Sequence, residues 1–325
     1  MTGHRPVMRS RIVGTGSYLP VGVLTNSDLE KRLDTTDAWI RERTGIERRH
    51  IVAPGETTVD MAEHAARSAL AAAGCDPREL DLIVVGTCTP DLIFPNAGVM
   101  LQARLGNLGT PALSVEAACS GFIYALSVAD KFIRAGEAKL ALVVGAESLS
   151  KITDYSDRGT AILFGDGAGA VVLAPAAEPG ILSTHLHADG SHIELLRCTG
   201  GVSRGLHPEG NFITMAGSEV FRIAVNTLGR AVQETLDANG VSKEELTWLV
   251  PHQANIRIIQ ATARKLELPM ERVIVTIADH GNTSTASVPL ALDVGVRDGR
   301  IKRGDLLLLE AFGGGFTWGS ALIRF

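Results

Sequence analysis

One cysteine of the chain stands where it could act as a nucleophile. Cys119 lies among small residues in the stretch EAACSGF (residues 116–122), and an apolar helical pattern follows over residues 124–133. A thiolate at a helix N-terminus is stabilised by the helix dipole and by free backbone N–H groups, and small neighbours leave space for a substrate. A buried structural cysteine fits the same pattern equally well, since that is the usual state of a lone cysteine.

Two further polar residues follow apolar segments. His252 comes directly after a predicted strand at residues 248–251, and α/β sheets bind ligands at the C-terminal ends of their strands. Asn282 lies in the loop HGNTS (residues 280–284) before a small-residue helix, and the neighbouring His280 could be mistaken for a catalytic histidine. Taken singly, a solvent-facing histidine and a turn asparagine are the commoner interpretations.

A run of three glycines follows another predicted strand. The segment FGGGF (residues 312–316) comes after the apolar run at 306–311. Glycines at such a place can direct backbone N–H groups at an oxyanion. A tight hairpin turn into a terminal strand at residues 320–325 is the alternative.

Cofactor and metal motifs are not recognisable. The segment GDGAG (residues 165–169) lacks the G-x-G-x-x-G spacing, and a β-like run follows it instead of a helix, so we expect no dinucleotide site. His185 and His187 alternate along a predicted strand without a third ligand, so we expect no metal. The cysteines are too few and too scattered for a disulfide framework or a zinc pair: they are Cys75, Cys88, Cys119 and Cys198.

Composition narrows the class of protein. The 325 residues are 45% hydrophobic and 21% charged, with a net charge of −5, which is typical of a globular chain with a sizeable core. The acidic balance excludes a globally basic nucleic-acid binder. No uncharged apolar run reaches the ~18 residues of a membrane span, and residues 1–10 are polar, without a secretory signal. We therefore expect a cytoplasmic protein with no nucleic-acid or membrane partner.

The elements that must position these residues recur at a fixed offset. A helical pattern with a small alanine face at residues 62–73 ends at Gly74, and an apolar strand follows at 82–85. A shift of 166 positions places Gly74 on Gly240 and residues 83–84 of this strand on 249–250, with the same helix–glycine–strand order. The strand at 142–143 falls on 308–309 at the same shift.

This offset predicts an α/β chain built from two similar halves. The turn-rich stretch PAAEPG (residues 175–180) is the expected connection. We divide the chain into an N-terminal half at 1–174, which carries the cysteine, and a C-terminal half at 175–325, which carries the histidine and asparagine. Duplicated chains often place a site where the halves meet.

Together, these segments resemble the β-ketoacyl-acyl-carrier-protein synthase III family, the condensing enzymes that initiate type II fatty acid synthesis. The resemblance covers nearly the whole chain and is carried by GTGSYLP (14–20), WIRERTGI (39–46), AACSGF (117–122), GTAILFGDGAG (159–169), PHQAN (251–255), HGNTS (280–284) and GGGFTWG (313–319). It implies the thiolase fold, with two α/β/α/β/α halves in pseudo-twofold arrangement, and a homodimer.

The resemblance also implies a ping-pong acyltransferase mechanism without metal or cofactor. Cys119 would take a short acyl group, with acetyl-CoA as the expected primer. Malonyl-acyl-carrier protein would then lose CO2 and attack that acyl group, giving 3-oxoacyl-carrier protein. His252 and Asn282 would donate hydrogen bonds to the thioester oxygen during decarboxylation. The backbone N–H groups of Cys119 and Gly314 would form the oxyanion hole.

Binding residues are implied by matched motif positions. Trp39 and Arg158 would hold the adenine of coenzyme A between them. The remaining residues of the nucleotide and pantetheine path would be Thr35, Arg43, Asn255 and Arg257. The basic patch for the acidic carrier protein would be Arg222, Arg257, Arg264 and Lys265, although an ordinary solvated helix face explains the last two nearly as well. Phe94 would reach across the dimer to close the acyl pocket.

Other functions use the same three residues. The 133 positions from Cys119 to His252 lie within the roughly 130–150 of papain-like proteases, but the local context of those proteases is absent. A thiolase-fold acyltransferase of secondary metabolism or a hydroxymethylglutaryl-CoA-type synthase would differ in the acceptor. A catalytically inactive relative would typically lack one of the three residues. The polar segment at 191–217 is either a site-covering loop or a plain surface loop.

Overall fold

The computed structural model describes residues 9–178, 180–205 and 210–325. The polar start of the chain at 1–8, Pro179 in the predicted connection, and residues 206–209 of the segment at 191–217 lie outside the described residues. No helix in the described part is both long and apolar enough to cross a bilayer.

The first half of the chain builds one mixed sheet. In the described residues it has five strands in the order β1 (Arg9–Tyr18), β7 (Asp166–Ala176), β6 (Ala141–Ser148), β4 (Leu82–Gly86) and β5 (Ala112–Val115). Strands β6, β4 and β5 run parallel, while β7 is antiparallel to both β6 and β1. The predicted strand at 82–85 is therefore confirmed, and it is fully buried, as a parallel strand covered on both faces must be.

The second half repeats this arrangement. Its sheet has, among the residues described, four strands in the order β11 (Trp248–Pro251), β12 (Leu306–Gly313), β13 (Thr317–Arg324) and β8 (Ile181–Ala188). Strand β11 is parallel to β12, and β13 is antiparallel to its neighbours. A single parallel bridge between Leu249 and Val273 stands where the first half has β5.

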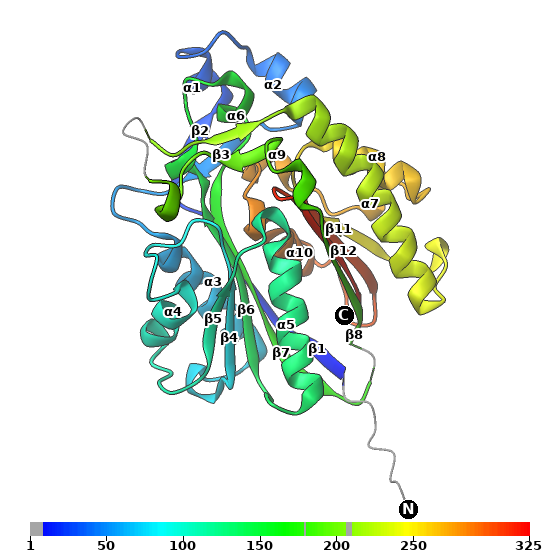
Figure 1. The fold of residues 1–325 in the computed structure, drawn as a ribbon. Coiled ribbons are helices and arrows are strands. Elements are labelled where there is room, and N and C mark those ends of the chain that lie inside the picture. The colour runs from blue at the N-terminus through cyan, green and yellow to red at the C-terminus, as the bar shows by residue number, and fades with distance from the viewer. Residues whose placement is uncertain (1–8, 179, 206–209) are drawn as a thin grey trace, which may run out of the picture.

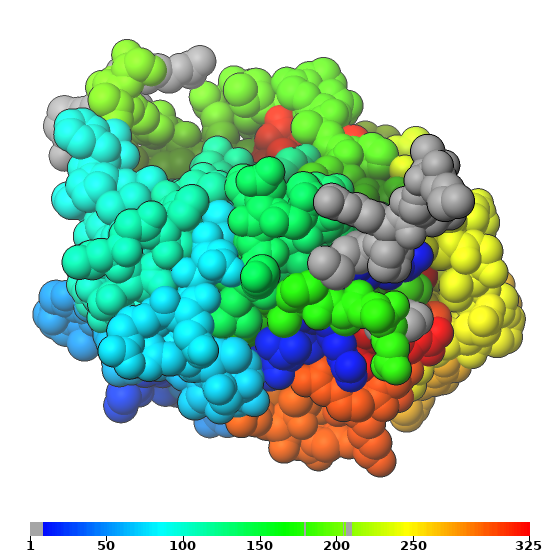
Figure 2. Space-filling view, turned by 90° about the horizontal axis from the view of Figure 1, so that it is seen from below, coloured from blue at the N-terminus to red at the C-terminus, as the bar shows by residue number. Residues whose placement is uncertain are grey.

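Helices fill the layers around the two sheets (Figure 1). The outer face of the first sheet is covered by α3 (Thr58–Ala73) and α4 (Ala97–Leu105). Between the sheets lie α5 (Gly121–Ala135) and α10 (Ser287–Arg297), which share one apolar core with both of them. The outer face of the second sheet packs against α7 (Gly217–Asn239) and α8 (Ile256–Lys265). Figure 2 shows the two halves side by side, with the blue N-terminal strand at the seam.

The remaining helices and strands are short and lie in the connections. They are β2 (Gly22–Thr25), α1 (Asn26–Glu30), α2 (Asp37–Thr44), β3 (Arg48–Ile51), α6 (Arg158–Ala161), β9 (Leu196–Cys198), β10 (Ile213–Met215) and α9 (Ile277–His280).

The offset of 166 residues holds in the structure. Helix α5 begins at Gly121 and α10 begins at Ser287, which are separated by that number of positions. Gly74 and Gly240 end α3 and α7 in the left-handed conformation, with φ of 67° and 60°. Glycine adopts this conformation without the strain that a Cβ causes. The duplicated architecture is thus confirmed.

Glycines on β1 explain why α3 presents a face of small alanine side chains. A Cβ at Gly14 would lie 2.3 Å from the carbonyl oxygen of Ala69, and one at Gly16 would lie 2.3 Å from its backbone nitrogen. The helix backbone therefore rests directly on the strand, which only small residues on both surfaces allow. The helix starts with a capping box in which Thr57 and Asp60 satisfy each other's backbone N–H groups.

The connection between the halves lies close to the predicted stretch. Strand β7 continues to Ala176, two residues beyond the proposed limit at 174, and β8 begins at Ile181. Strand β7 belongs to the first sheet and β8 to the second. The division into 1–174 and 175–325 stays a prediction.

Candidate active site

Cys119 lies in a tight turn immediately before α5. It belongs to the 3-10 helix η2 (Ala118–Ser120), and only 9% of its surface is exposed. The preceding residue, Ala118, has φ of 44°, a left-handed conformation that is costly for a residue with a Cβ. The carbonyl oxygen of Ala118 lies 2.6 Å from the Thr285 hydroxyl. This turn directs the thiol into a cavity rather than into the core.

Burial dominates the acidity of this thiol. The pKa of Cys119 is raised to about 11, mainly because a buried thiolate loses its hydration, with the charge of an ionised Glu147 as a smaller contribution. Hydrogen bonds from the Ser284 side chain and from the backbone of Cys119 and Gly314 act in the opposite direction and lower it. The position before α5 had suggested a stabilised thiolate, but the structure has a thiol that is mostly protonated at neutral pH.

His252 follows β11 and is almost completely buried. Its backbone N–H bonds the carbonyl of Glu310 at 2.8 Å, and its Nδ1 lies 2.6 Å from the Ser287 hydroxyl. Burial lowers the pKa of His252 to about 3, so the imidazole is neutral at neutral pH. Ser287 also accepts the Gln253 N–H. With the serine proton directed at Nδ1, the neutral imidazole carries its own proton on Nε2, where it can be donated to a ligand.

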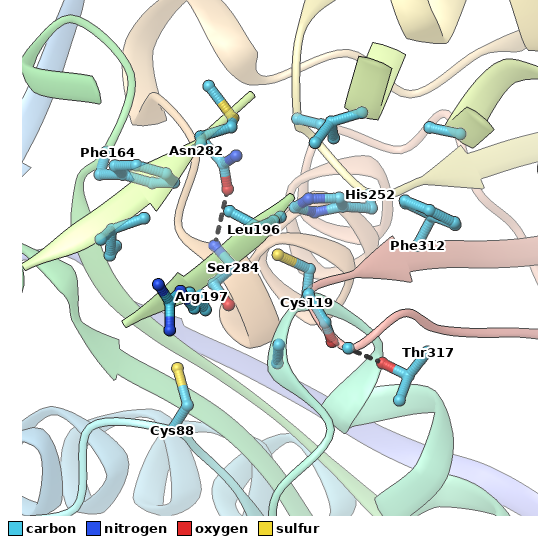
Figure 3. Close-up of a pocket in the computed structure, with 18 of the residues that line it drawn as sticks. Cys88, Cys119, Phe164, Leu196, Arg197, His252, Asn282, Ser284, Phe312 and Thr317 are labelled. Carbon is cyan, nitrogen blue, oxygen red and sulfur yellow. Dashed lines mark hydrogen bonds between the residues drawn. The ribbon is translucent and has the colours of Figure 1, made fainter. Parts of the chain in front are cut away.

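Asn282 is held by backbone contacts with the segment that precedes β7. Its N–H donates to Leu163 at 2.9 Å, and its carbonyl accepts from Gly165 at 3.0 Å. The side-chain Oδ1 accepts the N–H of Ser284 at 2.9 Å. That bond fixes the amide orientation and leaves the Nδ2 group as the end that can donate to a ligand (Figure 3).

The glycine run forms a hairpin turn, and it also lies very close to Cys119. It connects β12 to the antiparallel strand β13, so the predicted hairpin turn is present. A Cβ on Gly313 would lie 2.6 Å from the backbone nitrogen of Cys119, so the turn comes within contact distance of the candidate nucleophile. The backbone N–H of Gly314 then faces the Cys119 sulfur.

These residues line one cavity of about 540 Å³ between the halves (Figure 3). Cys119 is contributed by the first half, and His252 and Asn282 by the second. Apolar side chains form much of the remaining wall, among them Phe164, Leu196 and Phe312. The segment at 191–217 supplies part of this wall through β9 and β10, so this part of it belongs to the site and is not a plain surface loop.

Two arginine side chains lie over the indole ring of Trp39, which is not itself part of the cavity lining. The guanidinium of Arg158 lies 4.9 Å from its ring centre, and that of Arg43 lies 5.5 Å away, both in the range of cation–π contacts. Thr35 is close in sequence, and its buried hydroxyl has no partner among the described residues. Asn255 lines the cavity and caps α8 by accepting the Arg257 N–H.

The four predicted patch cations lie on α7 and α8, whose side-by-side course is visible in Figure 1. All of them are exposed, and none forms an ion pair with a described residue: they are Arg222, Arg257, Arg264 and Lys265. Arg257 lies over the ring of Phe221 at 5.3 Å, and Phe221 lines the cavity. Arg257 therefore lies beside the cavity.

Phe94 is not brought to the cavity of its own chain. It is 84% exposed in a segment with exposed Leu92 and Ile93.

The two histidines that alternate along β8 share one acidic partner. His185 and His187 both contact Glu234, at 3.4 and 2.8 Å.

Known proteins match this chain over nearly its full length. The family model for 3-oxoacyl-(acyl-carrier-protein) synthase III matches residues 113–190, and that for its C-terminal part matches 236–325. A β-ketoacyl-(acyl-carrier-protein) synthase III from Xanthomonas euvesicatoria is 63% identical over 319 residues, covering 97% of this chain and 98% of the relative. One from Alkalilimnicola ehrlichii is 61% identical over 320 residues, covering 97% and 99%.

The chain belongs to the synthase III family.

A solved structure agrees with this assignment. The crystal structure of the synthase III from Aquifex aeolicus matches with a TM-score of 0.92 at 48% identity, covering 97% of this chain and all of that one. The expected thiolase fold is confirmed, as is the expected class of enzyme, a condensing acyltransferase that initiates fatty acid synthesis. The papain-like and inactive-relative alternatives have no support from these matches.

Sequence reasoning missed several polar residues of this synthase III site. Ser287 bonds the candidate histidine, and Ser284 contacts the candidate nucleophile. Both lie within five positions of Asn282, so the helix that follows the asparagine was the signal. Glu147 is fully buried beneath Cys119 and contacts Thr285. It had no sequence signal, because it ends a strand that is otherwise apolar or small.

Proposed function

We propose that this synthase III transfers an acetyl group from acetyl-CoA to Cys119 and condenses it with malonyl-acyl-carrier protein. The products are 3-oxoacyl-carrier protein, coenzyme A and CO2. The observation that carries the proposal is the convergence of a thiol, a neutral imidazole and an oriented amide on one apolar cavity. The relatives at about 60% identity do not favour an acyltransferase of secondary metabolism.

The first half-reaction is acyl transfer to sulfur. Cys119 attacks the thioester carbonyl, the carbon–sulfur bond to coenzyme A breaks, and the thiol proton leaves with coenzyme A as its free thiol. The negative oxygen of the tetrahedral intermediate lies between the N–H groups of Cys119 and Gly314. The close approach of Gly313 to the Cys119 nitrogen supports this arrangement, because it holds both donors on the same side of the sulfur.

The second half-reaction needs donors that carry no charge. Loss of CO2 from the malonyl group leaves an enolate, whose oxygen receives hydrogen bonds from His252 Nε2 and Asn282 Nδ2. The low pKa of His252 keeps the imidazole neutral, and its contact with Ser287 keeps the proton on Nε2. The enolate attacks the acetyl carbonyl, the Cys119 sulfur leaves, and a proton from solvent restores the thiol. The chemistry requires no metal or cofactor.

Binding residues follow from the surroundings of the cavity. The indole of Trp39 and the guanidinium of Arg158 form the adenine site, and the other residues toward coenzyme A are Thr35, Arg43, Asn255 and Arg257. The carrier protein docks on Arg222, Arg257, Arg264 and Lys265, whose freedom from internal ion pairs with described residues leaves them for an acidic partner.

We infer that the protein works as a cytoplasmic homodimer. The exposed apolar side chains of Leu92, Ile93 and Phe94 support a partner at this face, since monomers rarely expose such a group. Phe94 of one protomer then closes the acyl pocket of its partner. Each protomer consists of the halves 1–174 and 175–325.

The test is the mass of the intact protein after incubation with acyl-CoAs, followed by peptide mapping. The cavity is lined by three cysteines, Cys88, Cys119 and Cys198, which gives a matched control. We expect one acetyl adduct, on the Cys119 peptide, in the native protein and in Cys88→Ser, and none in Cys119→Ala. An adduct retained in Cys119→Ala would overturn the nucleophile assignment.

A further inference from the structure

A buried carboxyl lies beneath the candidate nucleophile and takes no part in the proposed chemistry. Glu147 stands near the end of β6 with none of its surface exposed. It forms no ion pair with a described residue. Its neighbours are hydroxyls, a thiol and one backbone N–H. An isolated carboxylate at such a place would be costly, because nothing replaces its hydration by opposite charge.

Thr285 supplies the observation that decides the state of this carboxyl. Its hydroxyl oxygen lies 2.7 Å from Glu147 Oε1 and 2.6 Å from the carbonyl oxygen of Ala118. Two oxygens come this close only with a hydrogen between them. The threonine has one hydroxyl hydrogen and the carbonyl has none. The second hydrogen must therefore belong to Glu147.

The other oxygen of the carboxyl completes the pattern. Glu147 Oε2 lies 2.6 Å from the Thr89 hydroxyl, which also accepts the N–H of Ser148. Because the carboxyl proton is on Oε1, the hydrogen between Oε2 and Thr89 is the threonine's own. Oε2 is then the acceptor end and Oε1 the protonated end. The Cys88 N–H, 3.2 Å from both oxygens, is shared between them.

The chain of bonds ends on the peptide that carries the oxyanion-hole donor. The carbonyl of Ala118 and the N–H of Cys119 belong to one planar peptide group, so a bond to the first orients the second. Ala118 has the left-handed φ of 44°, which such a bond helps to hold.

The charges around Glu147 give a second reason to expect its carboxyl to be neutral. The titratable groups that face Glu147 are the thiols of Cys88 and Cys119, and burial raises the pKa of Glu147 itself. A carboxylate here would raise the pKa of both thiols and would oppose formation of a Cys119 thiolate. A neutral acid keeps the hydrogen bond without this penalty.

We propose that Glu147 is held as the neutral acid and acts as a positioning residue: it donates to Thr285, which donates to Ala118 and so aims the Cys119 N–H at the oxyanion. This rests on the proposed function for the meaning of the oxyanion hole. The protonation state itself does not depend on it.

The first experiment reads the proton directly. Infrared difference spectra between the native protein and Glu147→Gln at neutral pH should contain the carbonyl stretch of a protonated carboxylic acid, shifted in D2O. Glutamine keeps a donor toward Thr285 and an acceptor toward Thr89, so the fold should be retained. Carboxylate bands in the difference spectrum, with no acid band, would overturn the proposal. Neither result requires the enzyme to be active.

The second experiment uses the thiol as a charge sensor. Alkylation of Cys119 by iodoacetamide is followed against pH, with peptide mapping to separate Cys119 from Cys88. Replacement of a neutral acid by glutamine leaves the inflection of the profile in place, whereas removal of a carboxylate moves it to lower pH. A shift to lower pH in Glu147→Gln would contradict the neutral state.

The third experiment tests the positioning role. Thr285→Val keeps the methyl group that packs against Gly86 and Gly145 but removes the hydroxyl, and Thr285→Ser keeps the hydroxyl. We expect acylation of Cys119 to fall about 100-fold in Thr285→Val, as for misplaced catalytic groups, with KM for acetyl-CoA unchanged and the rate largely restored in Thr285→Ser. Equal losses in the two variants would show that packing alone matters.

Discussion

The Nδ1 atom of His252 lies 2.6 Å from the hydroxyl of Ser287, which also accepts the backbone N–H of Gln253. When the serine hydroxyl donates its proton to Nδ1, the second ring nitrogen carries the proton that faces the cavity. The chemistry of His252 therefore depends on a residue on α10, the helix packed between the two sheets.

Removal of this hydroxyl should affect one half-reaction only. In Ser287→Ala the imidazole loses its partner and both tautomers become accessible. We expect decarboxylative condensation to fall about tenfold, the cost of one unmade buried hydrogen bond, while acylation of Cys119 stays within a few-fold of the native rate. Rapid-quench measurements of the two half-reactions separate these effects. A loss of the same size in both would show that Ser287 supports the site as a whole.

Replacement of His252 or Asn282, the two proposed hydrogen-bond donors, should slow decarboxylation more than the loss of Ser287 does. His252→Ala and Asn282→Ala each remove one hydrogen bond to the developing enolate, and loss of one such donor typically costs about 100-fold or more. We expect this loss in CO2 release from malonyl-carrier protein. The acetyl adduct on Cys119 should still form in both variants, as intact-protein mass would record. Failure to form the adduct would contradict the division of roles.

Much of this arrangement could be predicted from the sequence. The offset of 166 residues, the buried strand at 82–85 and the alanine face of α3 were readable because they depend on local periodicity and on spacing along one chain. Cys119, His252 and Asn282 were readable because each follows a strand or precedes a helix. Their meeting in one cavity agrees with the expectation that a duplicated chain places a site where its halves meet.

The polar neighbours of these residues could not be predicted. Glu147 meets Thr285 across 138 positions, a contact that is created by the packing of the turn before α10 (Ser284–Ala286) against the first sheet. The acidity of Cys119 could not be predicted for a related reason, and the sequence left a stabilised thiolate and a buried thiol equally open. The local signal, a helix N-terminus, lowers a thiol pKa, but burial depends on the distant glycine turn and the cavity walls, and here it prevails.

The glycine turn should tolerate no side chain. A Cβ at Gly313 would meet the Cys119 nitrogen at 2.6 Å, a backbone atom that cannot rotate away. We expect Gly313→Ala to displace the oxyanion hole and to lower the acylation rate by about 100-fold. Gly190→Ala is the matched control, since a Cβ at Gly190 meets no atom within 4 Å. Similar acylation rates in the two variants would contradict the geometry.

The carrier-protein patch can be tested by charge reversal. Arg257→Glu places a negative charge beside the cavity, where it repels an acidic partner, so KM for malonyl-carrier protein should rise several-fold and more strongly at low salt. Lys302→Glu is the control: it is exposed and lies before β12, at the opposite end of that strand from the active site. An equal effect of the two changes would assign the loss to net charge rather than to docking.

A second buried carboxyl should make stability depend on pH. Burial raises the pKa of Glu310 from 4.5 to about 8. The unfolded chain therefore releases this proton from about pH 4.5 upward, while the folded chain keeps it until about pH 8. The contribution of Glu310 is fully present below pH 4.5 and is lost progressively up to about pH 8, with a total on the order of 5 kcal/mol from about 1.4 kcal/mol for each pKa unit. Glutamine at this position cannot titrate, so Glu310→Gln should become more stable relative to the native protein as pH rises through this window. Urea unfolding at a series of pH values measures the difference, and a difference that does not vary with pH would show that Glu310 is already ionised in the fold.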